Sequence, residues 1–144
     1  MSRILSIDYG TVRVGVAVTD PLQLIATGLT TVPANQIFKF LTDYMAKEPV
    51  ESIIVGEPRN LSNGFDPVVA PTLAFIDKLK ELFPSIPVIT VDERFTSRMA
   101  SRAMIDGGLK KMKRRDKAMI DKISATIILQ TYMEMRTAKN AGRS

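Results

Sequence analysis

Near its start the chain reads Arg3-Ile4-Leu5-Ser6-Ile7-Asp8-Tyr9-Gly10-Thr11, and a second apolar run follows from Val12 to Val18. Both runs have the composition of strands, and Gly10 allows a tight turn between them. The sequence therefore predicts two strands around a turn, with Asp8 where the first strand ends. A carboxylate in that position is poorly solvated and must find a proton, a cation or a metal. Alternatively, Asp8 could simply close the turn through its side chain.

The later chain alternates between strand and helix patterns. Further strands are predicted at 25–33, 52–56 and 88–91. Helices are predicted at 35–47, from the end of a loop at 57–67 to about 83, from 96 or 97 to about 106, and at 117–137. Three leading strands imply an antiparallel meander, and the later alternation implies parallel strands with helical crossovers. The predicted fold class is α/β, with a mixed five-stranded sheet flanked by helices.

The length and composition limit the possible organisation and location. A chain of 144 residues is most simply one domain, here expected over 1–138, with a disordered tail at 139–144. No apolar run approaches the roughly 20 residues that span a bilayer. A strand pattern that begins at residue 3 leaves no room for a signal peptide. We therefore expect a cytoplasmic protein with no membrane partner.

The composition also removes several kinds of chemistry. The chain contains no Cys and no His, which excludes thiolate nucleophiles, disulfides and the commonest general base. Hard cations with oxygen ligands remain, and Mg²⁺ or Mn²⁺ suits carboxylates. The sequence has neither a phosphate-loop motif nor a dinucleotide-binding glycine pattern, which lowers the expectation of a nucleotide-hydrolysing switch or a dinucleotide enzyme.

The positive charge is concentrated in one segment. The net charge is +5, and residues 107–117 alone hold six basic residues and one acid. The candidate nucleic-acid contacts are Lys110, Lys111, Lys113, Arg114, Arg115 and Lys117, together with Arg13 and Arg94. A basic segment on an otherwise neutral body predicts contact with a polyanion such as a nucleic-acid backbone. The same segment could instead be an unstructured, solvated loop.

Three acids are the candidate metal ligands. Asp8 and Glu93 both follow predicted strands, and the carboxyl ends of neighbouring parallel strands share one edge, where ligands bind in open α/β sheets. Asp121 lies on a small and apolar stripe of the last predicted helix, where it needs a metal, a Lys or an Arg as compensation. As alternatives, Glu93 could pair with Arg94 or Arg98, and Asp121 could be favoured by a helix N-terminus.

Three carboxylates at one edge have a definite chemical use. Two cations bound by them can clamp a phosphodiester, one activating the attacking water and the other stabilising the leaving oxygen. The basic segment would hold the flanking backbone, largely without reading its sequence.

Several motifs, taken together and in order, resemble the YqgF family. They are Ile7-Asp8-Tyr9-Gly10-Thr11 with Arg13-Val14-Gly15-Val16-Ala17, then Val55-Gly56-Glu57-Pro58-Arg59-Asn60, then Val91-Asp92-Glu93-Arg94-Phe95-Thr96-Ser97, and finally Ile120-Asp121-Lys122-Ile123-Ser124-Ala125 before Ile128-Leu129-Gln130. The resemblance implies an RNase H-like fold and a role as a pre-16S ribosomal RNA nuclease or a Holliday-junction-resolvase-like protein. It also implies that Asp8, Glu93 and Asp121 are the catalytic, metal-binding acids.

Two positions depart from that family pattern. The chain has Glu57 where members often carry an apolar residue, and Phe95 where they often carry Leu. Neither position is one of the three acids, but Glu57 adds a charge near the predicted site, where the substrate would approach.

The predicted function is a Mg²⁺- or Mn²⁺-dependent nuclease that acts on structured RNA, in the 5′-end maturation of pre-16S rRNA, as a monomer or weak homodimer. One alternative is a resolvase of branched DNA, which would use the same acids and need paired active sites. Another is a non-catalytic RNA-binding factor in ribosome assembly that uses the basic segment alone. An actin-like or sugar-kinase ATPase would need two such domains, and the chain has room for one.

Overall fold

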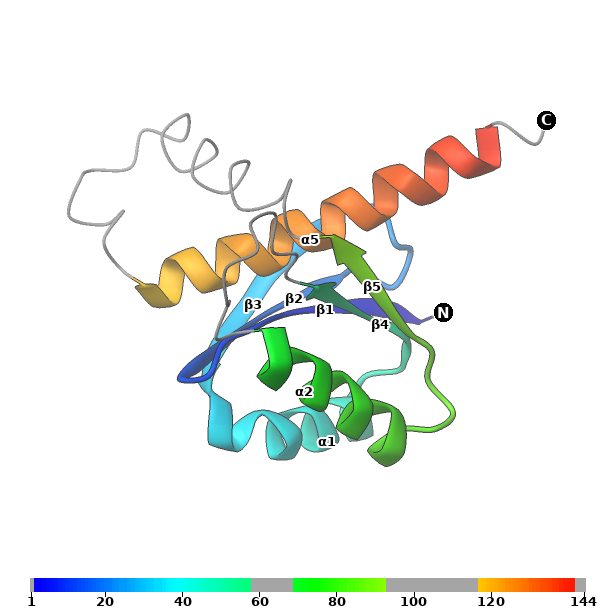
Figure 1. Ribbon diagram of the computed structural model, residues 1–144. Coiled ribbons are helices and arrows are strands. Elements are labelled where there is room, and N and C mark those ends of the chain that lie inside the picture. Colours follow the sequence, from blue (N-terminus) through cyan, green and yellow to red (C-terminus); the bar gives the residue numbers. More distant parts are fainter. Residues whose placement is uncertain (1, 58–68, 93–116, 142–144) are drawn as a thin grey trace.

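The computed structural model describes residues 2–57, 69–92 and 117–141 (Figure 1). The strands are β1 (Arg3–Tyr9), β2 (Arg13–Thr19), β3 (Ala26–Pro33), β4 (Val50–Glu57) and β5 (Val88–Asp92). The helices are α1 (Ile37–Lys47), which follows a short 3₁₀ turn at Ala34–Gln36, α2 (Val69–Leu82) and α5 (Lys117–Ala141).

The five strands form one mixed sheet in the order β3-β2-β1-β4-β5. β2 is antiparallel to both β1 and β3, whereas β1, β4 and β5 run parallel as neighbours. A parallel pair needs a crossover connection, and α1 and α2 precede β4 and β5 in the chain. The predicted mixed five-stranded sheet is therefore confirmed, including the parallel arrangement of its first, fourth and fifth strands.

Helices cover both faces of the sheet, with α1 and α2 on one side and α5 on the other (Figure 1). Because strand side chains alternate between faces, β1 contributes to two separate cores. Leu5 and Ile7 pack toward α1 and α2, whereas Ile4 packs toward Ala125 and Ile128 of α5. Full burial of each such aliphatic side chain stabilises the fold by about 1.5–3 kcal/mol.

The predicted and observed elements differ mainly at their ends. α5 extends to Ala141, beyond the predicted end near 137, so residues 139–141 of the predicted tail belong to the helix. Ala and Lys favour helix, and the next residue, Gly142, is the first strong breaker. The helix predicted from 96 or 97 to 106 lies outside the described residues.

Candidate active site

The carboxyl ends of the three parallel strands meet at one edge of the sheet. Ile7 of β1 pairs with Val55 of β4, and Glu57 at the end of β4 pairs with Asp92 at the end of β5. Asp8 follows Ile7 directly, so it lies level with the last residues of β4. The structure confirms that the first, fourth and fifth strands end together, which is where ligands bind in open α/β sheets.

Asp8 and Asp121 lie on the same face of this edge. Asp8 pairs with Gly15 of β2, and residues opposite one another in an antiparallel pair project to the same side. A Cβ atom added to Gly15 would overlap the backbone carbonyl group of Asp121 and lie 3.1 Å from its Cβ. Opposite Cβ atoms are about 4.5–5.5 Å apart, so the Cβ atoms of the two acids are less than roughly 9 Å apart. Side chains that start this close can place both carboxylates around one small volume.

A buried hydrogen bond holds α5 on the sheet next to these acids. The Ser6 hydroxyl donates to the Ala125 carbonyl oxygen at 2.6 Å, and the Ser6 side chain is fully buried. Ser6 precedes Asp8 by two residues on β1, and Ala125 follows Asp121 by one turn of α5. The bond therefore sets the register of the helix against the strand that carries Asp8.

On the face of the sheet that α1 and α2 cover, an aromatic contact holds the last residue of β1 in place. The Tyr9 ring stacks on Phe75 of α2, with centroids 4.4 Å apart and planes 11° from parallel. Gly10 follows, and a Cβ atom there would lie 2.6 Å from the Arg13 carbonyl oxygen. We expected Gly10 to permit a tight turn, and the structure adds that the backbone of this same hairpin approaches it too closely for a side chain.

Arg13 has a partner that the sequence did not indicate. Its Nε donates to Asp121 Oδ2 at 2.9 Å, and the two side chains are 37% and 22% exposed. Arg13 was predicted as a nucleic-acid contact, whereas the structure pairs it with a predicted metal ligand. Of the compensations expected for Asp121, a metal, a Lys or an Arg, the structure shows Arg. Arg13 lies two residues from Gly15 on the same face of β2, which is the face that α5 covers.

Other predicted site residues lie outside the described part of the chain. They are Glu93, Arg94, Lys110, Lys111, Lys113, Arg114, Arg115 and the side chain of Lys117. Within residues 2–57, 69–92 and 117–141, no cluster of three or more acids could hold a metal. The structure therefore brings Asp8 and Asp121 together and leaves the third predicted ligand a prediction.

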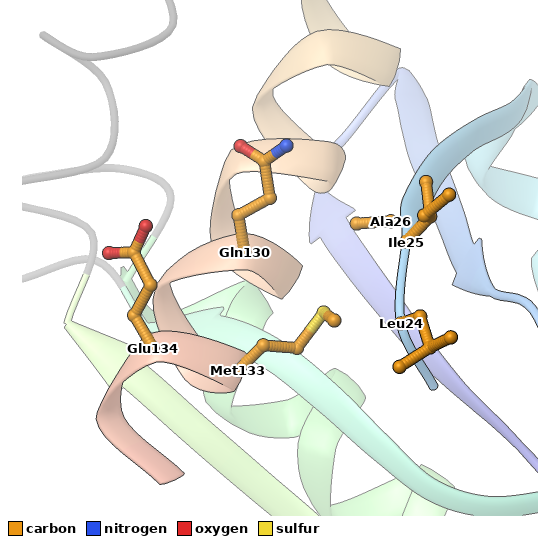
Figure 2. A pocket seen from close by; sticks show the side chains of 6 residues that line it. All are labelled: Leu24, Ile25, Ala26, Gln130, Met133 and Glu134. Carbon is orange, nitrogen blue, oxygen red and sulfur yellow. The ribbon is translucent and has the colours of Figure 1, made fainter. Parts of the chain in front are cut away.

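A hollow elsewhere on the molecule is distinct from the paired acids. It has a volume of about 390 Å³ and is lined by Leu24, Ile25, Ala26, Gln130, Met133 and Glu134 (Figure 2). Met133 lies twelve residues beyond Asp121, which corresponds to about 18 Å along α5. The lining side chains offer one carboxylate and mostly apolar surface, so they lack the ligands of a metal site.

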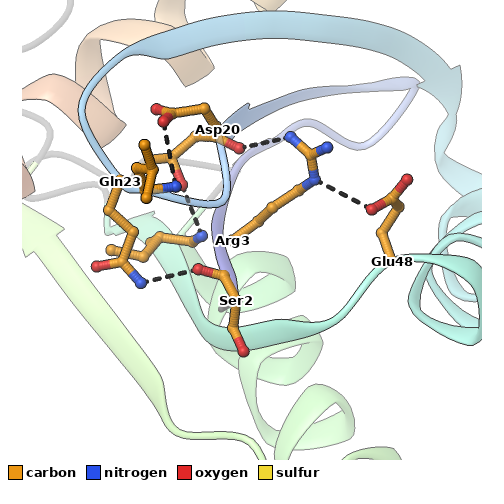
Figure 3. A network of polar contacts seen from close by, with 8 residues as sticks. Ser2, Arg3, Asp20, Gln23 and Glu48 are labelled. Atoms are coloured by element: carbon orange, nitrogen blue, oxygen red, sulfur yellow. Dashed lines mark hydrogen bonds and ion pairs between the residues drawn. The ribbon is translucent and has the colours of Figure 1, made fainter.

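A polar network ties together the opposite end of the sheet (Figure 3). Arg3 pairs with Glu48 at 3.3 Å and donates from Nη1 to the Thr19 carbonyl oxygen at 3.0 Å. The Asp20 carboxylate accepts backbone N–H groups of the β2–β3 loop, including that of Ile25 at 2.8 Å. The hydrogen bond from Ile25 is the main cause that lowers the pKa of Asp20. These contacts are structural, because they lie at the amino end of β1, away from Asp8.

No helix in the described parts of the chain is long and apolar enough to cross a membrane.

Comparison with known proteins shows the family to which the whole chain belongs. A family model described as RuvX, Holliday junction resolvase, matches residues 2–135. Over 136 residues the chain is 56% identical to a protein of Phocaeicola vulgatus and 54% identical to one of Bacteroides thetaiotaomicron. These alignments cover 94% of this chain and 98% and 99% of the relatives, both named "Putative pre-16S rRNA nuclease".

Solved structures with low sequence identity share the fold. RuvC of Thermus thermophilus, in complex with a Holliday junction substrate, superposes with a TM-score of 0.58 at 18% identity, covering 94% of this chain and 96% of that one. Fowlpox virus resolvase, with Holliday junction DNA, gives 0.59 at 16% identity, covering 92% and 97%. These likenesses confirm the RNase H-like fold that the sequence resemblance implied. The chain belongs to the RuvX family of nucleases, which is also the YqgF family that its motifs resemble.

Proposed function

We propose that this protein is a divalent-metal-dependent nuclease that hydrolyses phosphodiester bonds of structured RNA in the 5′-end maturation of pre-16S rRNA. The observation that carries the proposal is the contact between α5 and Gly15. Gly15 pairs with Asp8 across the two strands, and Asp121 of α5 lies directly against Gly15. The names of relatives that are more than half identical to this chain support RNA as the substrate.

The donor set at this edge fits Mg²⁺ or Mn²⁺. Carboxylate oxygens are the ligands that these cations prefer, and Asp8 and Asp121 supply them from two different elements. Ile89 and Val91 of β5 both pack toward α5, and Glu93 follows two residues later. If β5 continued its alternation for one more residue, Glu93 would join the same face as the third ligand.

The chain's own residues have separate tasks in this proposal. A bound cation would activate a water and stabilise the leaving oxygen of the phosphodiester. Asp8, Asp121 and Glu93 would hold it in place. The basic segment at 107–117 and Arg94 would bind the flanking phosphates.

The test compares wild-type protein with Asp8→Asn on precursor 16S rRNA in the presence of Mg²⁺. Loss of a ligand charge should lower the single-turnover cleavage rate by at least roughly 100-fold, because the metal supplies most of the charge stabilisation. Asp43→Asn is the matched control, since Asp43 is an exposed acid of α1 on the opposite face. Equal cleavage by wild type and Asp8→Asn would refute the assignment.

A second candidate is a resolvase of branched DNA, favoured by the description of the matching family model. It would use the same acids and would need two active sites held together. We expect a monomer or weak homodimer in the cytoplasm. Sedimentation, with cleavage assays on a four-way DNA junction and on an RNA precursor, separates these functions. RNA binding that survives replacement of Asp8 and Asp121, without cleavage in wild type, would instead identify a non-catalytic assembly factor.

A further inference from the structure

We propose that Arg13 is a counter-cation that holds Asp121 while the site is metal-free, and that a divalent metal displaces it and frees its guanidinium for a phosphate of the nucleic acid. Metal loading would then prepare the protein for its substrate. The inference rests on the proposed function, because it assumes that Asp121 binds the metal.

The ion pair lies inside the proposed site. Arg13 Nε is 2.9 Å from Asp121 Oδ2. Arg13 is the first residue of β2, two positions from Gly15 on the same face, and Gly15 is opposite Asp8. Residues diagonal to one another on a sheet face are about 7–8 Å apart, which is within the reach of an Arg side chain. The guanidinium can therefore serve the same edge with or without Asp121.

The pair is weak enough to exchange. The Arg13 side chain is 37% exposed and that of Asp121 is 22% exposed. Ion pairs in contact with solvent are weak, because water and salt screen them. Mg²⁺ carries twice the charge of a guanidinium and approaches a carboxylate oxygen to about 2.0–2.1 Å, so its Coulomb attraction is roughly three times stronger. The metal should therefore displace the Arg13 guanidinium from the Asp121 carboxylate.

A displaced Arg13 would be suited to a phosphate. Arg stays protonated at all working pH values, so it cannot lose its charge when the metal arrives. The two cations would repel one another, and the exposed side chain can move outward. A guanidinium presents donors that match phosphate oxygens in pairs, and a substrate phosphate would offset both positive charges. Binding of metal and of nucleic acid would thus favour one another, and the coupling must be reciprocal.

The test uses full-length Arg13→Gln, which removes the charge and keeps a polar side chain. Mn²⁺ binding is measured without nucleic acid, from the electron paramagnetic resonance signal of free Mn²⁺. We expect Arg13→Gln to bind Mn²⁺ about two- to fivefold more tightly, because a competing cation is gone. Binding of a fluorescein-labelled RNA hairpin, followed by anisotropy, should weaken about threefold or more when Mn²⁺ is present and remain unchanged without it.

Arg3→Gln is the matched control, since Arg3 makes a similar ion pair, with Glu48 at 3.3 Å, at the other end of the sheet. It should change neither measurement. Arg13→Lys keeps the charge and should leave the Mn²⁺ affinity near that of wild type. In wild-type protein, the Arg13 Nε–H should exchange with water faster when Mg²⁺ is added, a signature that needs no variant.

Unchanged or weaker Mn²⁺ binding by Arg13→Gln would overturn the exchange, as would an Arg13 Nε–H that stays protected when Mg²⁺ is bound. The proposed function fails on a different result, namely cleavage that survives in Asp8→Asn.

Discussion

Replacing Gly15 with Ala should damage the site through one methyl group. The new Cβ would overlap the carbonyl group of Asp121, whereas ordinary contacts are 3.4–4 Å. The two nearest atoms, the carbonyl carbon and oxygen of Asp121, belong to the backbone and cannot rotate away. Either α5 or β2 must therefore shift by about 1 Å or more. Overpacking of this kind costs about 1–3 kcal/mol. For a domain of this size, that corresponds to a fall in Tm of roughly 3–10 °C.

The effect on catalysis should exceed the effect on stability. A displacement of about 1 Å at a catalytic group can lower a rate by roughly 100-fold. We therefore expect Gly15→Ala to remain folded at 25 °C, to bind Mn²⁺ more weakly and to cleave precursor rRNA at about one hundredth of the wild-type rate. Thermal unfolding by circular dichroism, Mn²⁺ titration and single-turnover cleavage measure the three quantities.

Gly28→Ala provides the control, because Gly28 of β3 lies against the same helix, α5. A Cβ atom at Gly28 would lie 2.7 Å from Lys122 Cγ and 3.1 Å from Thr126 Oγ1, which are side-chain atoms. Side chains can adjust more easily than backbone, so Gly28→Ala should cost less stability and change the cleavage rate by less than about threefold. If Gly15→Ala kept wild-type Tm and cleavage, or if both variants lost activity equally, Gly15 would not be what positions Asp121.

Three other measurements test separate parts of the structure. Ser6→Ala removes the buried bond to the Ala125 carbonyl and should lower the free energy of unfolding in urea by about 1 kcal/mol; an unchanged midpoint would show that the bond does not hold α5. Backbone hydrogen bonds lower the pKa of Asp20, so NMR should show its carboxyl group titrating below the usual Asp range. The stability that the ionised carboxylate adds should be present above the unfolded-state pKa and be lost as the pH falls through the folded-state pKa. Changing both Lys111 and Arg114 to Gln should reduce the salt dependence of RNA binding by about 1.4 in log–log slope; the same slope as wild type would exclude the basic segment as a phosphate contact.

Much of the fold followed from local patterns. Most of the predicted run Val12–Val18 lies in β2, where residues 14–18 are buried, whereas Val12 precedes the strand and is exposed. Of the short run at 52–56, residues 53–56 are buried within β4. Helix ends were harder, as α5 shows, because propensity alone allows a helix to continue until a strong breaker occurs. Such signals reside in neighbouring residues and can be read along the chain.

Contacts within the site depend on distant residues. Arg13 and Asp121 are 108 positions apart, and nothing in either local sequence indicates that they pair. Similarly, Gly15 occurs in an apolar run where Ala would be equally compatible with a strand. Its need to be Gly arises only from the backbone of α5, which lies against it.

By itself, the sequence determined which chemistry was available: carboxylates without His or Cys, a strand that carries Asp8 near its end, and a basic segment that suits phosphates. Composition and periodicity are properties of the chain, so they can be determined without knowing how the chain packs. Only the tertiary structure decided that Asp121 lies against Gly15, the residue that pairs with Asp8, and that Arg13 forms an ion pair with Asp121. Those facts depend on the seating of α5 against the sheet, where steric contact between residues more than one hundred positions apart sets the geometry.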